Sequence, residues 1–222
     1  MTYPGGNAAL LRHWQYFLRS GADEIEIVMT NDDTHEWLPK GINGVKIGRD
    51  SYISGRHLPQ RLVDTVNTGL NNKTKFQHIL VAEYDCLFAK RIRYEAMEHG
   101  MAGYRAGSQT WGSKAKSFYH PPYLFKREAA EKFVSVAQEE INSGVCDRER
   151  GQPDPPEASP DVFVGLISEK YNIPIQDGLW DEYSRNSFDL PGHLDEARAA
   201  YKNGIDVLHG VKSSFELEFI TS

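Results

Sequence analysis

The chain has 222 residues, of which 40% are hydrophobic, 25% charged and 11% aromatic, and its net charge is −6. This composition supplies enough apolar material for a sizeable core and excludes a chain that is disordered throughout. No apolar run approaches the roughly 18 residues of a membrane span, and the first residues lack the basic and apolar regions of a signal peptide. Two cysteines, Cys86 and Cys146, are too few for a disulfide framework, so we expect a reducing, cytoplasmic setting.

Helical and extended patterns alternate along the chain. The first half predicts a helix over 7–21, strands over 24–30 and 45–47, a helix over 58–70 and a buried strand over 76–82. The second half predicts helices over 91–99, 127–143, 159–171 and 193–203, and strands over 103–106, 173–176 and 205–208. The polar segment 146–159 follows the predicted helix over 127–143. It contains three prolines and predicts a mobile loop.

This alternation predicts an α/β fold. We expect a single Rossmann-like domain with a mostly parallel mixed sheet and helices on both faces. Ligands of such sheets bind at the carboxyl ends of the strands. The polar turns 31–34 and 83–85 each follow a predicted strand, so both are candidate ligand contacts.

Charge is concentrated in one stretch, from Lys90 to Arg127. Eight basic and two acidic residues give it a charge of +6, so the rest of the chain carries −12. Aromatic residues are interleaved with the basic ones, and this mixture suits a ligand with phosphates and flat rings. The alternative is a solvated face beside ordinary core aromatics. The polar run 107–117 makes an exposed acceptor platform plausible, and its candidate residues are Trp111, Lys114, Lys116 and the nearby Tyr119.

The motif Glu83-Tyr84-Asp85 is the clearest chemical pattern. A dinucleotide-binding glycine motif, a Walker A motif, a metalloprotease helix and a nucleophile elbow are all absent from the sequence. Carboxylates at positions i and i+2 of an extended segment point the same way, and they follow an apolar strand here. Paired oxygen ligands suit a hard divalent cation that also binds phosphates. The alternative is that the two acids only keep the strand end soluble.

This arrangement resembles the nucleotide-sugar glycosyltransferases with the A-type fold, whose Asp-x-Asp motif follows the central strand. The resemblance extends over nearly the whole chain, and it implies a nucleotide-sugar-binding half over 1–88 and an acceptor half over 89–222. The opening residues 2–7 and the turn 31–34 resemble the first nucleotide-binding unit of that family, which implies donor contacts from Tyr3, Asp32 and Asp33. The segment 119–127 resembles the loop before the helix on the acceptor side. The first strand of the family fold is missing here or reduced to a stub.

The resemblance also implies a metal site and a catalytic base. It implies that Asp85, Glu83 and His209 hold Mn²⁺ or Mg²⁺, and that Glu83 and Lys212 contact the donor. Here the metal motif is Glu-x-Asp instead of Asp-x-Asp, and the alternative is that Glu83 contacts ribose or water rather than the metal. Asp161 stands at a helix start where inverting members keep their catalytic carboxylate.

These patterns together predict a metal-dependent glycosyltransferase. It would move a sugar from a nucleotide-diphosphate sugar to a hydroxyl acceptor, and an anionic acceptor such as a phosphorylated glycan or a hydroxylated DNA base would suit the basic stretch. In an inverting enzyme Asp161 is the general base, with Glu157 as a competing candidate; a retaining enzyme needs no such base. A nucleotidyltransferase and a non-catalytic sugar- or nucleotide-binding module remain alternatives.

Overall fold

The computed structural model describes residues 57–83, 85–90, 92–108, 112–184 and 192–222, and the strand backbone alone at 28–31 and 43–46. The chain divides into two compact units, each built from separate segments. Unit 1 comprises Met1–Lys46, Ala82–Arg93 and Trp180–Ser222, and unit 2 comprises Ile47–Val81 and Tyr94–Leu179. The predicted single domain with halves 1–88 and 89–222 stays a prediction. The predicted helix over 7–21 lies outside the described residues.

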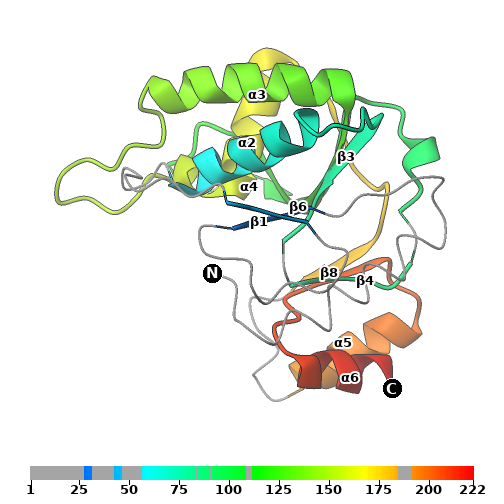
Figure 1. Cartoon of the computed structure of the whole chain (residues 1–222). Coiled ribbons are helices and arrows are strands. Elements are labelled where there is room, and N and C mark those ends of the chain that lie inside the picture. The colour runs from blue at the N-terminus through cyan, green and yellow to red at the C-terminus, as the bar shows by residue number, and fades with distance from the viewer. Residues whose placement is uncertain are drawn as a thin grey trace. The chain divides into compact units, whose positions relative to one another are not determined.

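Unit 2 is built on a four-stranded mixed sheet (Figure 1). Its strands, in spatial order, are β3 (His78–Val81), β6 (Ser117–Lys126), β5 (Met101–Ser108) and β7 (Ile175–Gln176). Strand β6 is antiparallel to both of its neighbours, and β7 is parallel to β5. Its helices are α2 (His57–Leu70), α3 (Arg127–Asn142) and α4 (Pro160–Tyr171), with short 3-10 helices η1 (Tyr94–Ala96) and η2 (Pro156–Ala158).

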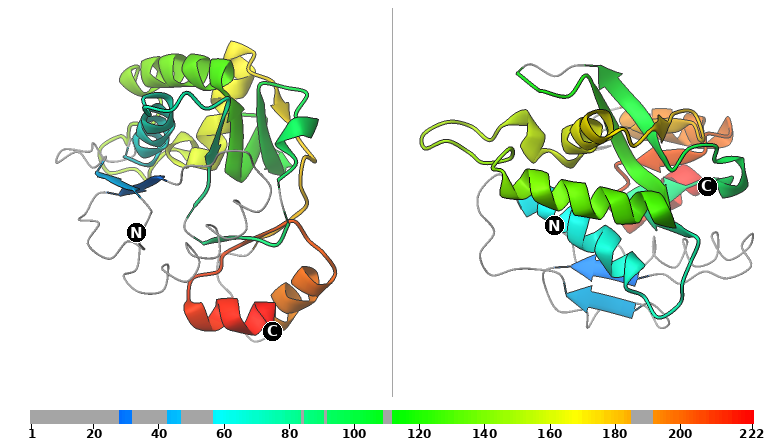
Figure 2. Two further views of the ribbon diagram at one scale, coloured as in Figure 1. Left: turned by 45° about the vertical axis from the view of Figure 1, so that its right-hand side comes forward. Right: turned by 90° about the horizontal axis from the view of Figure 1, so that it is seen from above.

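The helices and the sheet of unit 2 share one hydrophobic core. Helix α2 turns Leu62 and Val66 inward, because residues four apart lie on one helical face, and these meet side chains of α3, α4 and β6. Figure 2 shows α2 and α3 running side by side. Gly165 of α4 lies against β6 so closely that a Cβ there would come within 1.9 Å of the Ser117 carbonyl oxygen. This close approach of the middle of α4 to the first residue of β6 leaves no room for a side chain at Gly165.

Strand β6 corrects the expectation that 119–127 is a loop. Pro121 and Pro122 argue against a central strand, because proline donates no ladder hydrogen bond. The register removes this conflict. Pairing with β3 ends at Tyr123, so both prolines lie beyond it. On the other side they fall in a bulge, between the pairs Ala102–Leu124 and Tyr104–His120.

Unit 1 contains a three-stranded sheet of order β4-β9-β8. Strand β9 (Val207–His209) lies between an antiparallel β4 (Cys86–Phe88) and a parallel β8 (Glu182–Ser184). Two helices, α5 (His193–Lys202) and α6 (Ser214–Thr221), contact each other. A separate parallel pair is formed by β1 (Val28–Asn31) and β2 (Asn43–Lys46).

The α/β class and the mixed sheet are confirmed, and the predicted helices over 58–70, 127–143, 159–171 and 193–203 are present as α2, α3, α4 and α5. Three of the six described strand pairings are parallel and three antiparallel, so the sheets are more evenly mixed than expected. The predicted helix over 91–99 appears in its described part only as the short η1. Strands β4 and β8 and helix α6 were not expected. None of the described helices has the length and apolar character needed to cross a membrane.

Candidate active site

His209 lies at the centre of an acidic cluster in unit 1. Its Nε2 atom is 3.0 Å from Glu83 Oε2 and 3.3 Å from Asp85 Oδ1. The Asp85 side chain is 10% exposed, so its carboxylate contacts the imidazole in a buried position. The Glu83 side chain is 48% exposed, so its carboxylate contacts the imidazole from the solvent side. The structure thus brings together the three residues for which the sequence predicts metal binding.

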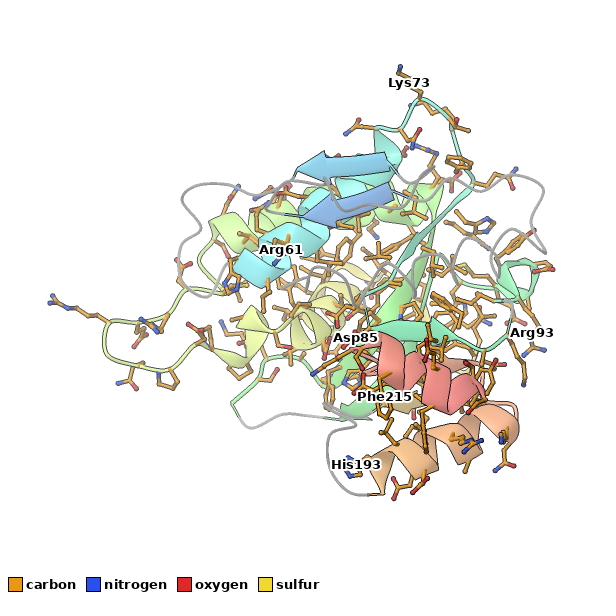
Figure 3. The ribbon with its side chains drawn as sticks, turned by 60° about the horizontal axis from the view of Figure 1, so that its bottom comes forward. Arg61, Lys73, Asp85, Arg93, His193 and Phe215 are labelled. Atoms are coloured by element: carbon orange, nitrogen blue, oxygen red, sulfur yellow. The ribbon has the colours of Figure 1, made fainter. Side chains whose placement is uncertain are left out.

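The strand register explains why these side chains meet. His209 ends β9 directly opposite Cys86, the first residue of the antiparallel β4, so Asp85 precedes β4 at the same edge of the sheet. Figure 3 marks Asp85 at this point. The Asp85 carbonyl oxygen accepts hydrogen bonds from the backbone N–H groups of Gly210 and Val211, at 3.1 and 2.9 Å. Gly210 has a φ of 117°, which side chains rarely allow, so the turn after His209 requires glycine.

A third carboxylate stands on the other side of the imidazole. Glu182 begins β8, its side chain is fully buried, and its Oε1 atom lies 3.5 Å from His209 Nδ1. Glu182 pairs with Val207 in the parallel ladder, so it is a diagonal neighbour of His209 on the same sheet face. Sequence reasoning missed Glu182, since nothing in the short run around it predicts a strand.

Burial lowers the pKa of His209, but Cys86 and the carboxylates of Asp85, Glu182 and Glu83 raise it by more, so its pKa lies well above the usual range. Burial also raises the pKa of Cys86, so this thiol is protonated and uncharged at neutral pH. The negative charges that stabilise a protonated His209 are therefore those of the carboxylates. His209 is therefore an imidazolium that forms ion pairs with the carboxylates around it. Only a neutral imidazole ligates a metal ion, so a cation that binds here would have to displace the proton of His209.

The donor set fits a hard divalent metal ion. Asp85 Oδ1 is buried, and within the described ranges no hydrogen bond reaches it. Ligand atoms of Asp85, Cys86 and His209 all lie within 4.8 Å of one another. Glu182 occupies the position of the carboxylate that usually orients a metal-binding histidine through its second ring nitrogen. Oxygen and imidazole ligands suit Mn²⁺ or Mg²⁺, whereas a protonated thiol does not.

Lys212 lies three residues after His209, at the start of α6. Its backbone N–H donates to the buried carboxylate of Glu216, as does that of Ser213. The Glu216 N–H in turn donates to the Ser213 hydroxyl oxygen, which completes a capping box. These bonds fix the backbone at Lys212, and contact of its side chain with the donor stays a prediction.

Asp161 belongs to a second polar cluster, in unit 2. The Tyr123 hydroxyl lies 3.1 Å from the Asp161 Oδ1 atom and 2.7 Å from the Tyr119 carbonyl oxygen, so these two acceptors share one proton. The Asp161 Oδ2 atom lies 3.4 Å from His120 Nε2. The side chain is 27% exposed, and it stands in the first turn of α4, where the helix dipole favours a carboxylate. Sequence reasoning missed Tyr123 and His120, because it read 119–127 as a loop.

Glu157 has a different place from Asp161. It is buried, and it accepts a hydrogen bond from the Lys114 N–H at 2.7 Å. Because this carboxylate holds backbone, the geometry favours Asp161 as the base. The ends of the segment 146–159 are anchored, since the buried Cys146 thiol contacts the Glu157 carbonyl oxygen at 3.2 Å, and mobility between them stays a prediction.

The predicted acceptor residues that the structure describes, Lys114, Lys116 and Tyr119, belong to unit 2. Lys114 and Lys116 line a cavity of about 590 Å³. Tyr119 instead lies in β6 and packs against the hydrophobic core, where burial raises its pKa. Trp111 and the predicted donor contacts Tyr3, Asp32 and Asp33 lie outside the described residues.

Comparison with known proteins identifies no family. No protein-family model matches the chain, and no curated protein does. Among solved structures, the glycosyltransferase GlyE of Streptococcus pneumoniae TIGR4 is similar, with a TM-score of 0.43 and 12% sequence identity. The similarity covers 96% of this chain and 58% of GlyE, so this chain spans less than two thirds of that protein. At this level the similarity carries no weight for function, and the assignment below rests on the residues described above.

Proposed function

We propose that this chain is a metal-dependent glycosyltransferase, which moves a sugar from a nucleotide-diphosphate sugar to a hydroxyl acceptor. The observation that carries the proposal is the meeting of Asp85, Glu83 and His209 at one sheet edge, with Glu182 buried behind the imidazole. An ordinary acidic strand end would leave its carboxylates in water, whereas Asp85 here is buried against a histidine from a distant part of the chain.

Asp85 and His209 would hold Mn²⁺ or Mg²⁺, with Glu83 as a further ligand or as a ribose contact. When bound, such an ion offsets the charge of the donor diphosphate and of the departing nucleotide. Lys212 adds a cation for the same phosphates. Tyr3, Asp32 and Asp33 are proposed as further donor contacts.

Asp161 would act as general base in an inverting reaction. Its carboxylate takes the proton of the acceptor hydroxyl, the hydroxyl oxygen bonds to the anomeric carbon of the sugar, and the bond from that carbon to the diphosphate breaks. Tyr123 and His120 hold the carboxylate from both sides, so its orientation is set before the acceptor arrives. Its partial exposure leaves room for a substrate hydroxyl.

Calorimetric titration with a panel of nucleotide-diphosphate sugars, with and without Mn²⁺, tests the proposal. We expect one donor to bind only when Mn²⁺ is present, and we expect the sugar to be lost slowly to water. Binding of a nucleoside triphosphate with release of pyrophosphate would indicate a nucleotidyltransferase instead. Metal-independent binding without turnover would indicate a binding module and overturn the proposal.

A further inference from the structure

The cavity that Lys114 and Lys116 line is bordered by charged side chains of both signs. It lies in unit 2, beside the ends of α3 and α4, and three lysines and two glutamates border it: Lys114, Lys116, Lys170, Glu140 and Glu169. Its volume of about 590 Å³ is within the range of small-molecule sites. The lining is nearly neutral by formal charge, so the pairing of these groups decides which ligand it suits.

Both glutamates are already engaged. Glu140 Oε1 accepts hydrogen bonds from the Lys170 ammonium and the Tyr171 hydroxyl, each at 2.5 Å. Burial alone would raise the pKa of Glu140, but these two donors lower it below its usual range, so the carboxylate is charged and compensated. Glu169 accepts bonds from the backbone N–H groups of Lys116 and Ser117, at 2.9 Å.

The ammonium groups of Lys114 and Lys116 have no such compensation. Neither forms an ion pair with a carboxylate of the described ranges, although Lys114 is near enough to Glu140 to lower its pKa. Their backbone is fixed, because Glu157 holds the N–H of Lys114 and Glu169 that of Lys116. Two cations on a fixed segment therefore border a cavity whose acids are satisfied, which favours an anionic group.

We propose that this cavity binds an anionic saccharide, one that carries a phosphate or a carboxylate. Lys114 and Lys116 would hold the anionic group. Val145 and Leu166 provide an apolar wall for the face of a sugar ring. Glu140 and Glu169 retain lone pairs that accept hydrogen bonds from sugar hydroxyls, since a carboxylate offers about four acceptor sites. These acceptors favour a hydroxylated ligand over the phosphate backbone of DNA.

The anion site depends on unit 2 alone, and only its role as the acceptor site rests on the proposed function. Ligand-observed NMR with glucose, glucose 6-phosphate and glucuronate tests it in buffer with EDTA and without nucleotide. We expect the two anionic sugars to bind at least about tenfold more tightly than glucose, and we expect their binding to weaken between about 50 and 200 mM salt.

A pair of double variants locates the site. Lys114→Ala with Lys116→Ala should weaken binding of glucose 6-phosphate about tenfold. Lys73→Ala with Lys75→Ala is the matched control, because it removes the same charge at the same spacing from exposed lysines of unit 2 and should change nothing. Figure 3 shows Lys73 extending from the turn after α2. Circular dichroism establishes that both variants fold.

Three results would overturn the inference. The first is equal binding of glucose and glucose 6-phosphate, and the second is an equal loss of binding in the two double variants. The third is a single-stranded oligonucleotide that binds more tightly than the sugars and whose binding is weakened only by the Lys114 and Lys116 changes. Since neither metal nor donor is present, these results do not depend on the His209 site. Failure of metal-dependent donor binding would contradict the proposed function and leave the anion site standing.

Discussion

The carboxylates of the two units differ in what they face. In unit 1, Asp85, Glu83 and Glu182 surround the single imidazole of His209. In unit 2, Glu140 and Glu169 are each matched by donors of the chain itself, an ammonium and a hydroxyl for the first and two backbone N–H groups for the second. Around His209 the carboxylates outnumber the single cation, whereas Glu140 is paired with an ammonium and Glu169 has its hydrogen bonds satisfied by backbone.

Under the proposed function, this difference distinguishes acids that bind a metal ion from acids that hold the fold. A buried carboxylate is stable when donors satisfy it, and it is costly when they do not. The cluster around His209 carries that cost at a sheet edge, where ligands of α/β proteins bind. The acids of unit 2 stabilise the segment that presents Lys114 and Lys116. Removal of an acid beside His209 should therefore affect ligand binding, and removal of Glu157 or Glu169, which hold the backbone before β6, should affect stability.

Asp85→Asn should have the largest effect. The amide keeps the shape of the side chain but removes the charge that a divalent ion needs, so metal-dependent donor binding should be lost while the fold remains. Calorimetry with Mn²⁺ and the donor measures this. Glu83→Gln is the matched control, and it should cost less because the Glu83 side chain is half exposed. Unchanged donor affinity in Asp85→Asn would remove the metal assignment.

Asp161→Asn should lower turnover by about 10²–10⁴-fold, the usual contribution of a general base. Donor affinity should not change, because this carboxylate is assigned to the acceptor proton. Steady-state kinetics gives the first quantity and titration the second. Glu157→Gln serves as the comparison, and its turnover should stay near that of the unchanged protein. Normal turnover in Asp161→Asn would indicate a retaining enzyme or another base.

Glu182→Gln tests the residue behind the imidazole. Groups that orient a metal-binding histidine typically change metal affinity by about 10–100-fold when they are replaced. We expect a loss of that size in Mn²⁺ affinity, without loss of the fold. A purely structural Glu182 would instead lower the melting temperature and leave Mn²⁺ affinity unchanged, and this outcome would reduce the site to Asp85, Glu83 and His209.

Glu157→Ala should act on stability. The buried carboxylate accepts the Lys114 N–H, and its removal leaves that donor without its partner, at a cost of about 1–3 kcal/mol in the free energy of unfolding. Urea denaturation measures the change. Glu149→Ala, in the exposed part of the same segment, should be nearly neutral. If both variants lose equal stability, Glu157 does not hold the segment.

Helices α2, α3, α4 and α5 were predictable because their apolar patterns are long enough to indicate a helix, whereas the predicted helix over 91–99 appears in its described part only as η1. Helix α3 is an example, since Ala130, Phe133, Ala137 and Ile141 recur at helical spacing and are all buried. The short strands β4 and β8 have only three residues each, too few for a period to appear. Helix α6 was missed although Ser213 and Glu216 have the spacing of a capping box.

The candidate site was predictable only in part. Asp85 and Glu83 follow an apolar strand, and His209 follows another, so their places at strand ends are local properties of the sequence. Glu182, His120 and Tyr123 reach their partners through strand register, which is set by tertiary packing. Because β6 contains Pro121 and Pro122, local propensity argued against the strand that positions two of these residues.

The smallest expected effect concerns Tyr171, and it tests whether Glu140 is in fact compensated. The hydrogen bond to Glu140, with smaller contributions from burial and from the charge of Glu140, raises the pKa of Tyr171 from 10.0 to about 12. A raised pKa in the folded state means that the stability from this bond is complete below about pH 10 and is lost as the pH rises through 12. Glu140→Gln should move the pKa of Tyr171 back toward 10, as followed by tyrosinate absorbance with circular dichroism to detect unfolding. Glu139→Gln should move it less, because Glu139 is the weakest contributor. If the pKa of Tyr171 does not change in Glu140→Gln, then the Glu140 carboxylate is not held by the Tyr171 hydroxyl. In that case Glu140 is free to offset the charge of Lys114 and Lys116, and the contrast between the acids of the two units fails.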